Sequence, residues 1–312
     1  YEILIGLMGS EMCIRDSYEA NEIDNIELLD TSSKDGHRIY IRGILYIMAK
    51  ALNEVYPEAL LSVNYQLSSA MFCKIDNMEI TDEMIAKVKA RMQEIINQNL
   101  EIRKVVMTKE EAEEFYSNEK TLRGIVQIDN TQKEGVSLYY CEDYFNYFFG
   151  VMPVTTAYTD VFDVIKYGDG FLVRYPSAEK PNELTNYKSN KKLLSTLEEY
   201  EDIHRVLQID TLYKLNKEIK EGRTSNVILL SEALHEKKMA NIADDIAKRK
   251  NVKMVLIAGP SSSGKTTFAK RLGVELRLNG LKPVTISVDN YFVERVDNPK
   301  DENGDYDFEC LE

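Results

Sequence analysis

The segment Gly259–Thr266 (GPSSSGKT) constrains this chain more than any other part of the sequence. It matches the pattern GxxxxGK(S/T) at every fixed position. It follows an apolar run, Lys253–Ala258, and precedes apolar residues at helical spacing that end at Gly280. Strand, glycine-rich loop and helix in this order cradle phosphate groups, because backbone N–H groups turn inward and the helix N-terminus adds its dipole. The sequence therefore predicts a nucleotide-binding loop at the start of an α/β domain with a parallel sheet.

The residues expected to bind the nucleotide run consecutively through this loop: Gly259, Pro260, Ser261, Ser262, Ser263, Gly264, Lys265, Thr266 and Thr267. Lys265 is expected to meet the β- and γ-phosphates and to neutralise charge there during catalysis, while the Thr266 hydroxyl holds Mg²⁺. The small serine side chains leave the loop room to wrap around the phosphates. ATP and Mg²⁺ are therefore the predicted cofactors.

A second apolar run, Pro283–Val288, predicts another strand, and Asp289 follows it directly. In parallel α/β sheets ligands bind beside the carboxyl ends of the strands, so Asp289 is a candidate catalytic residue. It could take a proton from an attacking hydroxyl, bind the metal through water, or simply cap a turn. The nearby aromatic residues Tyr291, Phe292 and Phe308 could stack on a flat base or belong to the core.

These residues resemble a known family. The segments SVDNYF (287–292) and DENGDYDFE (301–309) are similar to those of uridine kinases and related phosphoribulokinases. The resemblance implies that Asp289 acts as base toward the ribose 5′-hydroxyl of a nucleoside, that Phe308 packs near the base, and that Glu309 contacts the sugar hydroxyls. The family usually carries Asp at the position of Glu309. Because the resemblance covers only Asn251–Glu312, it implies a partial P-loop kinase domain.

Upstream, the sequence from Leu28 to about Pro176 predicts an α+β domain. Apolar residues over Ile39–Val55 indicate a helix with a broad buried face. Thr81 fits the N-cap of a second helix that extends to about Asn97, and the apolar residues of that helix form one stripe.

Later in this domain the pattern changes from helix to strand. Thr108 and Glu111 have the spacing of a capping box, which predicts a short helix over Lys109–Tyr116. The residues that follow are rich in aromatic and β-branched side chains, with Gly and Pro between the runs. They predict strands at Ser137–Tyr140, Tyr144–Phe149, Val161–Lys166 and Gly170–Tyr175.

The stretch before the phosphate-binding loop is polar and then mostly helical. Ser177–Asn190 predicts a linker, and Lys191–Glu221 predicts helices closed by Gly222. Val227–Leu230 predicts a strand, and Glu232–Lys250 predicts a charged helix.

We therefore predict an α+β domain over residues 18–180, a helical linker region over 181–250, and a partial kinase domain over 251–312. Residues 1–17 are expected to be non-native sequence, because GSEMCIRDS resembles a translated adapter and the stretch carries no motif. Since the chain starts at Tyr1 rather than Met and the predicted kinase domain is still incomplete at Glu312, we expect a chain truncated at both ends.

The upstream domain carries its own resemblance. Asp35–Arg38 (DGHR) and Ile80–Tyr116 resemble the second additional, editing-associated domain of threonyl- and alanyl-tRNA synthetases, in which HxxxH and CxxxH motifs hold a metal. Here Ile41 stands where the second histidine should follow His37, and Cys141 also lacks its histidine partner. With only 3 histidines in the chain, no His-rich zinc site is expected. His37 is expected to be a surface or capping residue, in a fold without the editing chemistry.

The net charge, the cysteine positions and the apolar runs indicate which partners and which compartment to expect. The formal net charge of −13 repels polyanions on average, so nucleic acid is not an expected partner. The 4 cysteines lie far apart, at positions 13, 73, 141 and 310, which predicts reduced thiols in a cytoplasmic protein. No apolar run approaches the ~18 residues that cross a bilayer, so no membrane partner is expected.

Domain order resembles that of bacterial two-part nucleoside kinases. The expected function is therefore ATP-dependent phosphorylation of a nucleoside such as uridine or cytidine at its 5′-hydroxyl. The alternative is an RNA-associated protein whose synthetase-like domain binds tRNA while the loop serves as an NTP-driven switch. This alternative predicts that RNA affinity depends steeply on salt concentration. A third interpretation is that this chain is inactive by itself. The sequence leaves the acceptor and the oligomeric state open.

Overall fold

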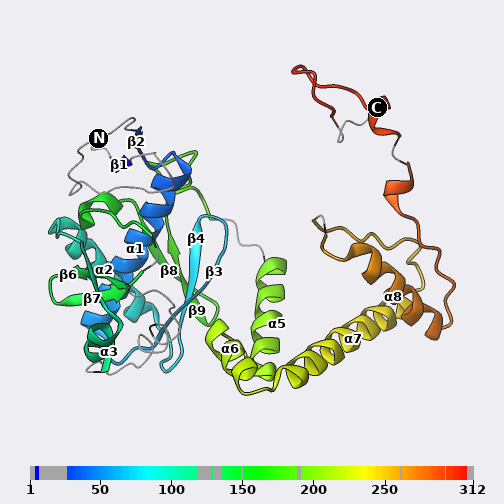
Figure 1. Cartoon of the computed structure of the whole chain (residues 1–312), viewed down its shortest axis with the longest axis horizontal. Helices are drawn as coiled ribbons and strands as arrows, with labels where there is room; N and C mark the ends of the chain where they lie inside the picture. Colours follow the sequence, from blue (N-terminus) through cyan, green and yellow to red (C-terminus); the bar gives the residue numbers. More distant parts are fainter. Residues whose placement is uncertain are drawn as a thin grey trace. The chain divides into compact units, whose positions relative to one another are not determined.

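The computed structural model describes residues 4–6, 27–117, 128, 135–148, 150–187, 191–260, 262–291 and 293–307. The chain divides into two compact units, Tyr1–Ser195 and Thr196–Glu312, which Figure 1 colours along the sequence. Within the described ranges, no helix combines the length and the apolar character that a membrane crossing requires.

The first unit is built on a four-stranded antiparallel sheet in the order β3-β4-β9-β8. Its strands are β3 (Leu61–Gln66), β4 (Ala70–Ile75), β9 (Gly170–Arg174) and β8 (Asp163–Tyr167). The helices α1 (Lys34–Val55) and α2 (Asp82–Asn97) pack on this sheet. Their apolar faces and the inward side chains of β4 and β9 form the largest core cluster, which includes Ile44, Met48, Met92, Cys73 and Phe171.

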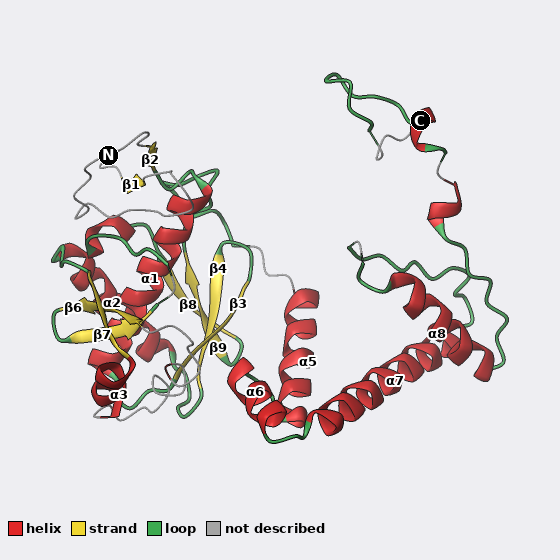
Figure 2. Ribbon diagram, in the orientation of Figure 1, coloured by secondary structure: helices red, strands yellow, loops and turns green. Residues whose placement is uncertain are grey.

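A smaller antiparallel sheet, in the order β5-β6-β7, contacts the opposite side of α1 (Figure 2). Its strands are β5 (Arg103–Thr108), β6 (Gly135–Cys141) and β7 (Tyr144–Tyr147). Tyr46 of α1 is fully buried against this sheet, and its hydroxyl donates to the carbonyl oxygen of Tyr139 at 3.0 Å. The helix α3 (Lys109–Ser117) follows β5 directly. The first unit also contains a short strand pair, β1 (Leu4–Gly6) with β2 (Glu27–Leu29), and the 3-10 helix η1 (Thr156–Thr159).

Side-chain caps start α2 and α3 where the sequence predicts them. The Thr81 hydroxyl accepts a hydrogen bond from the Met84 amide at 3.2 Å and begins α2. At α3 the capping box is reciprocal: the Thr108 amide donates to the Glu111 carboxylate at 2.8 Å, and the Glu111 amide donates to the Thr108 hydroxyl at 3.2 Å. Both predicted caps are confirmed, because a cap depends on groups only three residues apart.

One lysine is buried between α1 and the β6–β7 turn. The Lys50 side chain is only 2% exposed, and its ammonium donates to the carbonyl oxygen of Cys141 at 3.2 Å. It also pairs with Glu54 at 2.8 Å and with Glu142 at 3.2 Å. Burial alone would lower the pKa of Lys50, but the two carboxylates outweigh it and raise the pKa above its usual value. Lys50 therefore stays charged and joins α1 to the smaller sheet.

The second unit is helical where it has regular structure. It contains most of α5 (Lys191–Leu207) and all of α6 (Leu212–Lys220), α7 (Thr224–Lys248) and α8 (Lys265–Leu278). The short 3-10 helices η2 (Val288–Tyr291) and η3 (Arg295–Asp297) follow. α7 packs on α8 through a small core of Ala243, Leu272 and Leu276, with partly buried Phe268 and Ile257 against it.

Glycines in the left-handed region end two of these helices as predicted. Gly280 has φ +78°, its amide donates to the Arg277 carbonyl at 2.9 Å, and the Leu281 amide donates to the Leu276 carbonyl at 3.0 Å. This paired pattern satisfies the last carbonyls of α8. Gly222, at φ +74°, closes α6 in the same way.

The predicted parallel sheet is wrong for the part of the second unit that the structure describes. Val227–Leu230 lies inside α7, since a short apolar run can belong to either element and helix formers follow it. Lys253–Ala258 and Pro283–Val288 do not form strands, and Leu256 and Val284 are each 84% exposed. A strand is stable only beside hydrogen-bonded neighbours, and these described segments pair with none. The chain is thus a mixed α+β structure with small antiparallel sheets.

Candidate functional site

The phosphate-binding loop predicted at Gly259–Thr266 has the backbone of a tight turn that leads into α8. Ser262 has φ +59° and Gly264 has φ +82°, so two residues of the loop lie in the left-handed region. A Cβ atom on Gly264 would meet nothing within 4 Å, which means that backbone conformation, rather than space, favours glycine there. A Cβ on Gly259 would lie 2.8 Å from the Ser263 hydroxyl oxygen, because the two ends of the loop approach closely.

Lys265 occupies the mouth of this loop. Its Nζ donates to the carbonyl oxygens of Gly259 and Pro260, both at 2.8 Å, and the side chain is partly buried. A phosphate oxygen carries negative charge and a carbonyl oxygen does not, so an ammonium group is attracted more strongly to phosphate than to either carbonyl. An anion in the loop can therefore compete with the two carbonyls for this ammonium group.

The first turn of α8 adds backbone donors beside the lysine. The helical ladder begins with the Phe268 amide, which donates to the Gly264 carbonyl at 2.9 Å. The amides before it have no intrahelical partner, as at any helix N-terminus. Gly264 is the N-cap and has no side chain with which to satisfy them. Loop, lysine and helix N-terminus together suit a phosphate group, so the residues present fit the predicted nucleotide.

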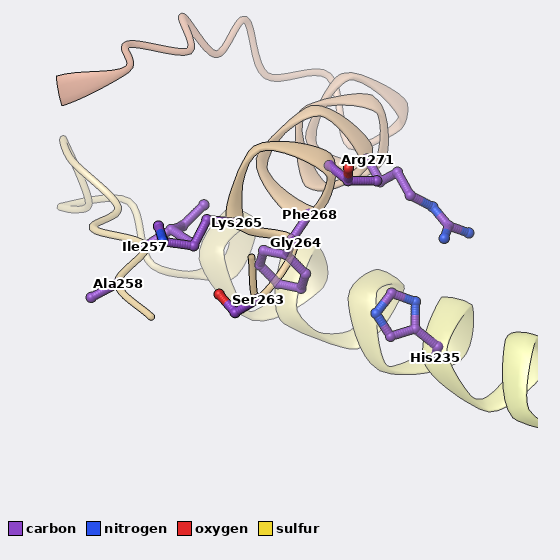
Figure 3. A pocket seen from close by; sticks show the side chains of 9 residues that line it. His235, Ile257, Ala258, Ser263, Gly264, Lys265, Phe268 and Arg271 are labelled. Carbon is purple, nitrogen blue, oxygen red and sulfur yellow. The ribbon is translucent and has the colours of Figure 1, made fainter. Parts of the chain in front are cut away.

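A cavity of about 370 Å³ adjoins the loop within the second unit (Figure 3). Loop residues Ser263, Gly264 and Lys265 line one part of it, and α8 contributes further side chains. His235 reaches it from α7, with its ring centroid 6.5 Å from that of Phe268. The complete lining is His235, Ile257, Ala258, Ser263, Gly264, Lys265, Thr267, Phe268 and Arg271.

Only part of the predicted site is brought together. Thr266 and Thr267 are exposed in the first turn of α8, as expected for groups that could meet Mg²⁺ and phosphate. Asp289 lies in η2 rather than at the end of a strand, and Tyr291 in the same element is 75% exposed. Ser261, Phe292, Phe308 and Glu309 lie outside the described residues.

His235 and Arg271 were not predicted as site residues. They come from two helices, and local residue spacing does not predict how those helices pack on each other. From the sequence, each residue fits an exposed, charged helix face as well as it fits a binding site. Nothing in the sequence around His235 distinguishes it from a solvent-facing histidine. Its placement depends on the contact of α7 with Leu272 and Leu276 of α8.

In the first unit, His37 makes a structural hydrogen bond and the described cysteines are buried. His37 lies in the first turn of α1, and its Nε2 donates to the Pro176 carbonyl oxygen at 2.9 Å, which ties α1 to the end of β9. Cys73 and Cys141 are buried free thiols, and burial raises the pKa of Cys141 to about 11. Among the residues that the structure describes, no group of three or more His, Cys, Asp or Glu side chains could hold a metal ion.

No protein-family model matches the chain. Its curated relatives include the threonine–tRNA ligase of Clostridium acetobutylicum, 28% identical over 37% of this chain and 18% of the relative. A probable cytoplasmic threonine–tRNA ligase of Enterocytozoon bieneusi is 25% identical over 64% of this chain and 31% of its own length. The threonine–tRNA ligase of Thermoplasma volcanium is 26% identical over 58% of the chain and 28% of the relative. The chain thus spans 18% to 31% of the length of these three relatives.

These similarities confirm a threonyl-tRNA synthetase-like segment and contradict other predictions. The prediction of a nucleoside kinase is wrong, because the relatives are ligases that act on tRNA. The predicted nucleoside substrate fails with it, whereas the role of Asp289 stays a prediction. The same relatives contradict the expectation that nucleic acid is not a partner. That expectation was based on net charge, which is a property of the whole chain and says little about one local surface.

Proposed function

We propose that this chain is an RNA-associated, nucleotide-binding protein. Its first unit contacts RNA of the tRNA class, and the loop Gly259–Thr267 of its second unit binds the phosphates of a nucleoside triphosphate. Binding is the activity we propose for the residues of this chain, which span 18% to 31% of the three relatives described above.

The length of the aligned segments supports the proposal that the first unit contacts RNA. A match over 64% of the chain is longer than the whole second unit, Thr196–Glu312, and must therefore include part of the first unit. The same holds for the match over 58% of the chain.

The geometry of the loop supports the nucleotide part. Lys265 would hold the β- and γ-phosphates, and Thr266 would contribute its hydroxyl to Mg²⁺. A contact from Asp289 to the metal through water stays a prediction. A bound triphosphate supplies a multiply charged anion; the chain supplies the cation at the loop mouth and the unpartnered amides of α8.

RNA binding is tested by titrating fluorescently labelled tRNA with the full chain from 50 to 200 mM salt. If about three phosphates are contacted, the affinity should fall about 20- to 40-fold over this range, because each contact releases counterions. Unlabelled tRNA should compete at least tenfold better than a DNA duplex of equal charge. Equal competition by the two nucleic acids would contradict the assignment to RNA.

Nucleotide binding is tested by calorimetric titration of Mg·ATP into the same protein. Lys265→Ala should abolish measurable binding, whereas Lys270→Ala removes an equal charge from an exposed position on the same helix and should leave it unchanged. Equal losses in both variants would show that net charge, and not the loop, attracts the nucleotide. No heat from the wild-type chain would contradict the nucleotide part of the proposal.

A further inference from the structure

We infer that the cavity between α7 and α8 holds the nucleoside part of the nucleotide whose phosphates lie on the loop. The inference rests on the proposed nucleotide binding and adds the position of the base and ribose. It assigns His235 of α7, together with Phe268 and Arg271 of α8, to a nucleoside subsite.

The position of the cavity is the first argument. Ser263, Gly264 and Lys265 of the loop line it, and so do side chains of the following helix and of α7. A ligand with its phosphates at Lys265 can therefore extend into this cavity, toward His235 of α7. The volume of about 370 Å³ lies within the range of roughly 300 to 1,000 Å³ that is usual for small-molecule sites.

The chemistry of the walls is the second argument. Phe268 and Ile257 give the cavity an apolar surface on which a flat base can stack. His235 offers one nitrogen donor and one nitrogen acceptor when neutral, which suits a base edge or a ribose hydroxyl. Figure 3 shows its ring extending from α7 toward the side chains of Phe268 and Arg271.

The two walls are held in place before a ligand arrives. Arg271 donates to the Glu236 carboxylate at 2.6 Å, and Asn279 donates to the Asp244 carboxylate at 2.9 Å, so polar bonds join α8 to α7 at two points. Buried Leu272 lies between these points and packs against α7. Pre-formed walls reduce the ordering cost of binding, which favours a ligand site over an incidental gap.

The test compares two anions in the full chain: the β,γ-imido analogue of ATP and inorganic tripolyphosphate, both with Mg²⁺. His235→Ala removes the exposed histidine and keeps a strong helix former, so α7 should remain intact. It should weaken binding of the analogue about five- to tenfold and leave tripolyphosphate binding unchanged. Asn241→Ala, at an exposed polar position of α7 away from the cavity lining, is the matched control and should change neither affinity.

Every other result overturns the subsite, and one of them also overturns the proposed nucleotide binding. If the wild-type chain binds both anions equally, or if His235→Ala leaves the analogue unaffected, the nucleoside subsite is refuted while the phosphate loop stands. If His235→Ala weakens both anions to the same extent, the histidine acts on the loop and the subsite is again refuted. If the wild-type chain binds neither anion, the proposed nucleotide binding fails, and the subsite fails with it.

Discussion

Lys50 offers the sharpest test of how the first unit is held together. Its ammonium group has three acceptors: the Cys141 carbonyl oxygen and the carboxylates of Glu54 and Glu142. Lys50→Met keeps most of the buried stem but removes the charge. Glu54 and Glu142 are 29% and 50% exposed, so water can solvate them again, whereas the Cys141 carbonyl loses its cationic partner. We expect the free energy of unfolding to fall by about 1–3 kcal/mol.

Lys50→Ala should cost more, because it also removes three buried methylene groups worth about 0.8 kcal/mol each. The total loss should be about 3–5 kcal/mol. Urea denaturation followed by tyrosine near-ultraviolet circular dichroism reports on this region, since Tyr46 and Tyr144 lie in edge contact with centroids 5.3 Å apart. Lys87→Met, which removes an exposed ion pair with Glu83, is the control and should leave the transition unchanged. A neutral or stabilising Lys50→Met, or equal losses for Met and Ala, would refute this reasoning.

Other consequences are as specific. Burial alone would raise the pKa of Glu54, but hydrogen bonds from cationic partners outweigh it and lower the pKa below its usual value. Glu54→Gln should therefore reduce the free energy of unfolding at pH 7. The difference in unfolding free energy between wild type and variant should shrink as the pH of the denaturation experiment falls through the folded-state pKa of Glu54. Burial raises the pKa of both Cys73 and Cys141, so native protein at pH 8 should resist iodoacetamide at these thiols, and rapid labelling in peptide mass maps would contradict their burial. Gly264 and Gly280 lie at the two ends of α8, both with left-handed backbone, and a Cβ at either position would meet nothing within 4 Å. Gly264→Ala and Gly280→Ala should each lower the free energy of unfolding by about 1–2 kcal/mol. Only Gly264→Ala should weaken Mg·ATP binding in calorimetry.

Features fixed by a few neighbouring residues could be predicted from the sequence. The Thr81 cap, the capping box at Thr108 and the glycine end at Gly280 each depend on groups within five residues of one another. One local element was nevertheless missed. The hairpin of β3 and β4 was not predicted, because its turn uses Ser68 at φ +54° where glycine or asparagine is usual.

In the candidate site, too, local features were predictable from the sequence and long-range ones were not. The loop around Lys265 was found from its motif, since the chemistry of a phosphate cradle demands those residues in that order. The strands expected on either side were not confirmed, because apolar residues such as Leu256 form a strand only when a neighbouring strand pairs with them. His235 entered the site through helix packing alone, which single-sequence periodicity cannot reveal.

The most direct test of the central claim is a competition experiment at 100 mM salt, in which tRNA and a DNA duplex of equal charge displace labelled tRNA from the full chain. Our account predicts that tRNA displaces the label at a concentration at least tenfold lower than the duplex does. Absence of any complex, or equal displacement by the two competitors, would contradict an RNA-associated function for this chain.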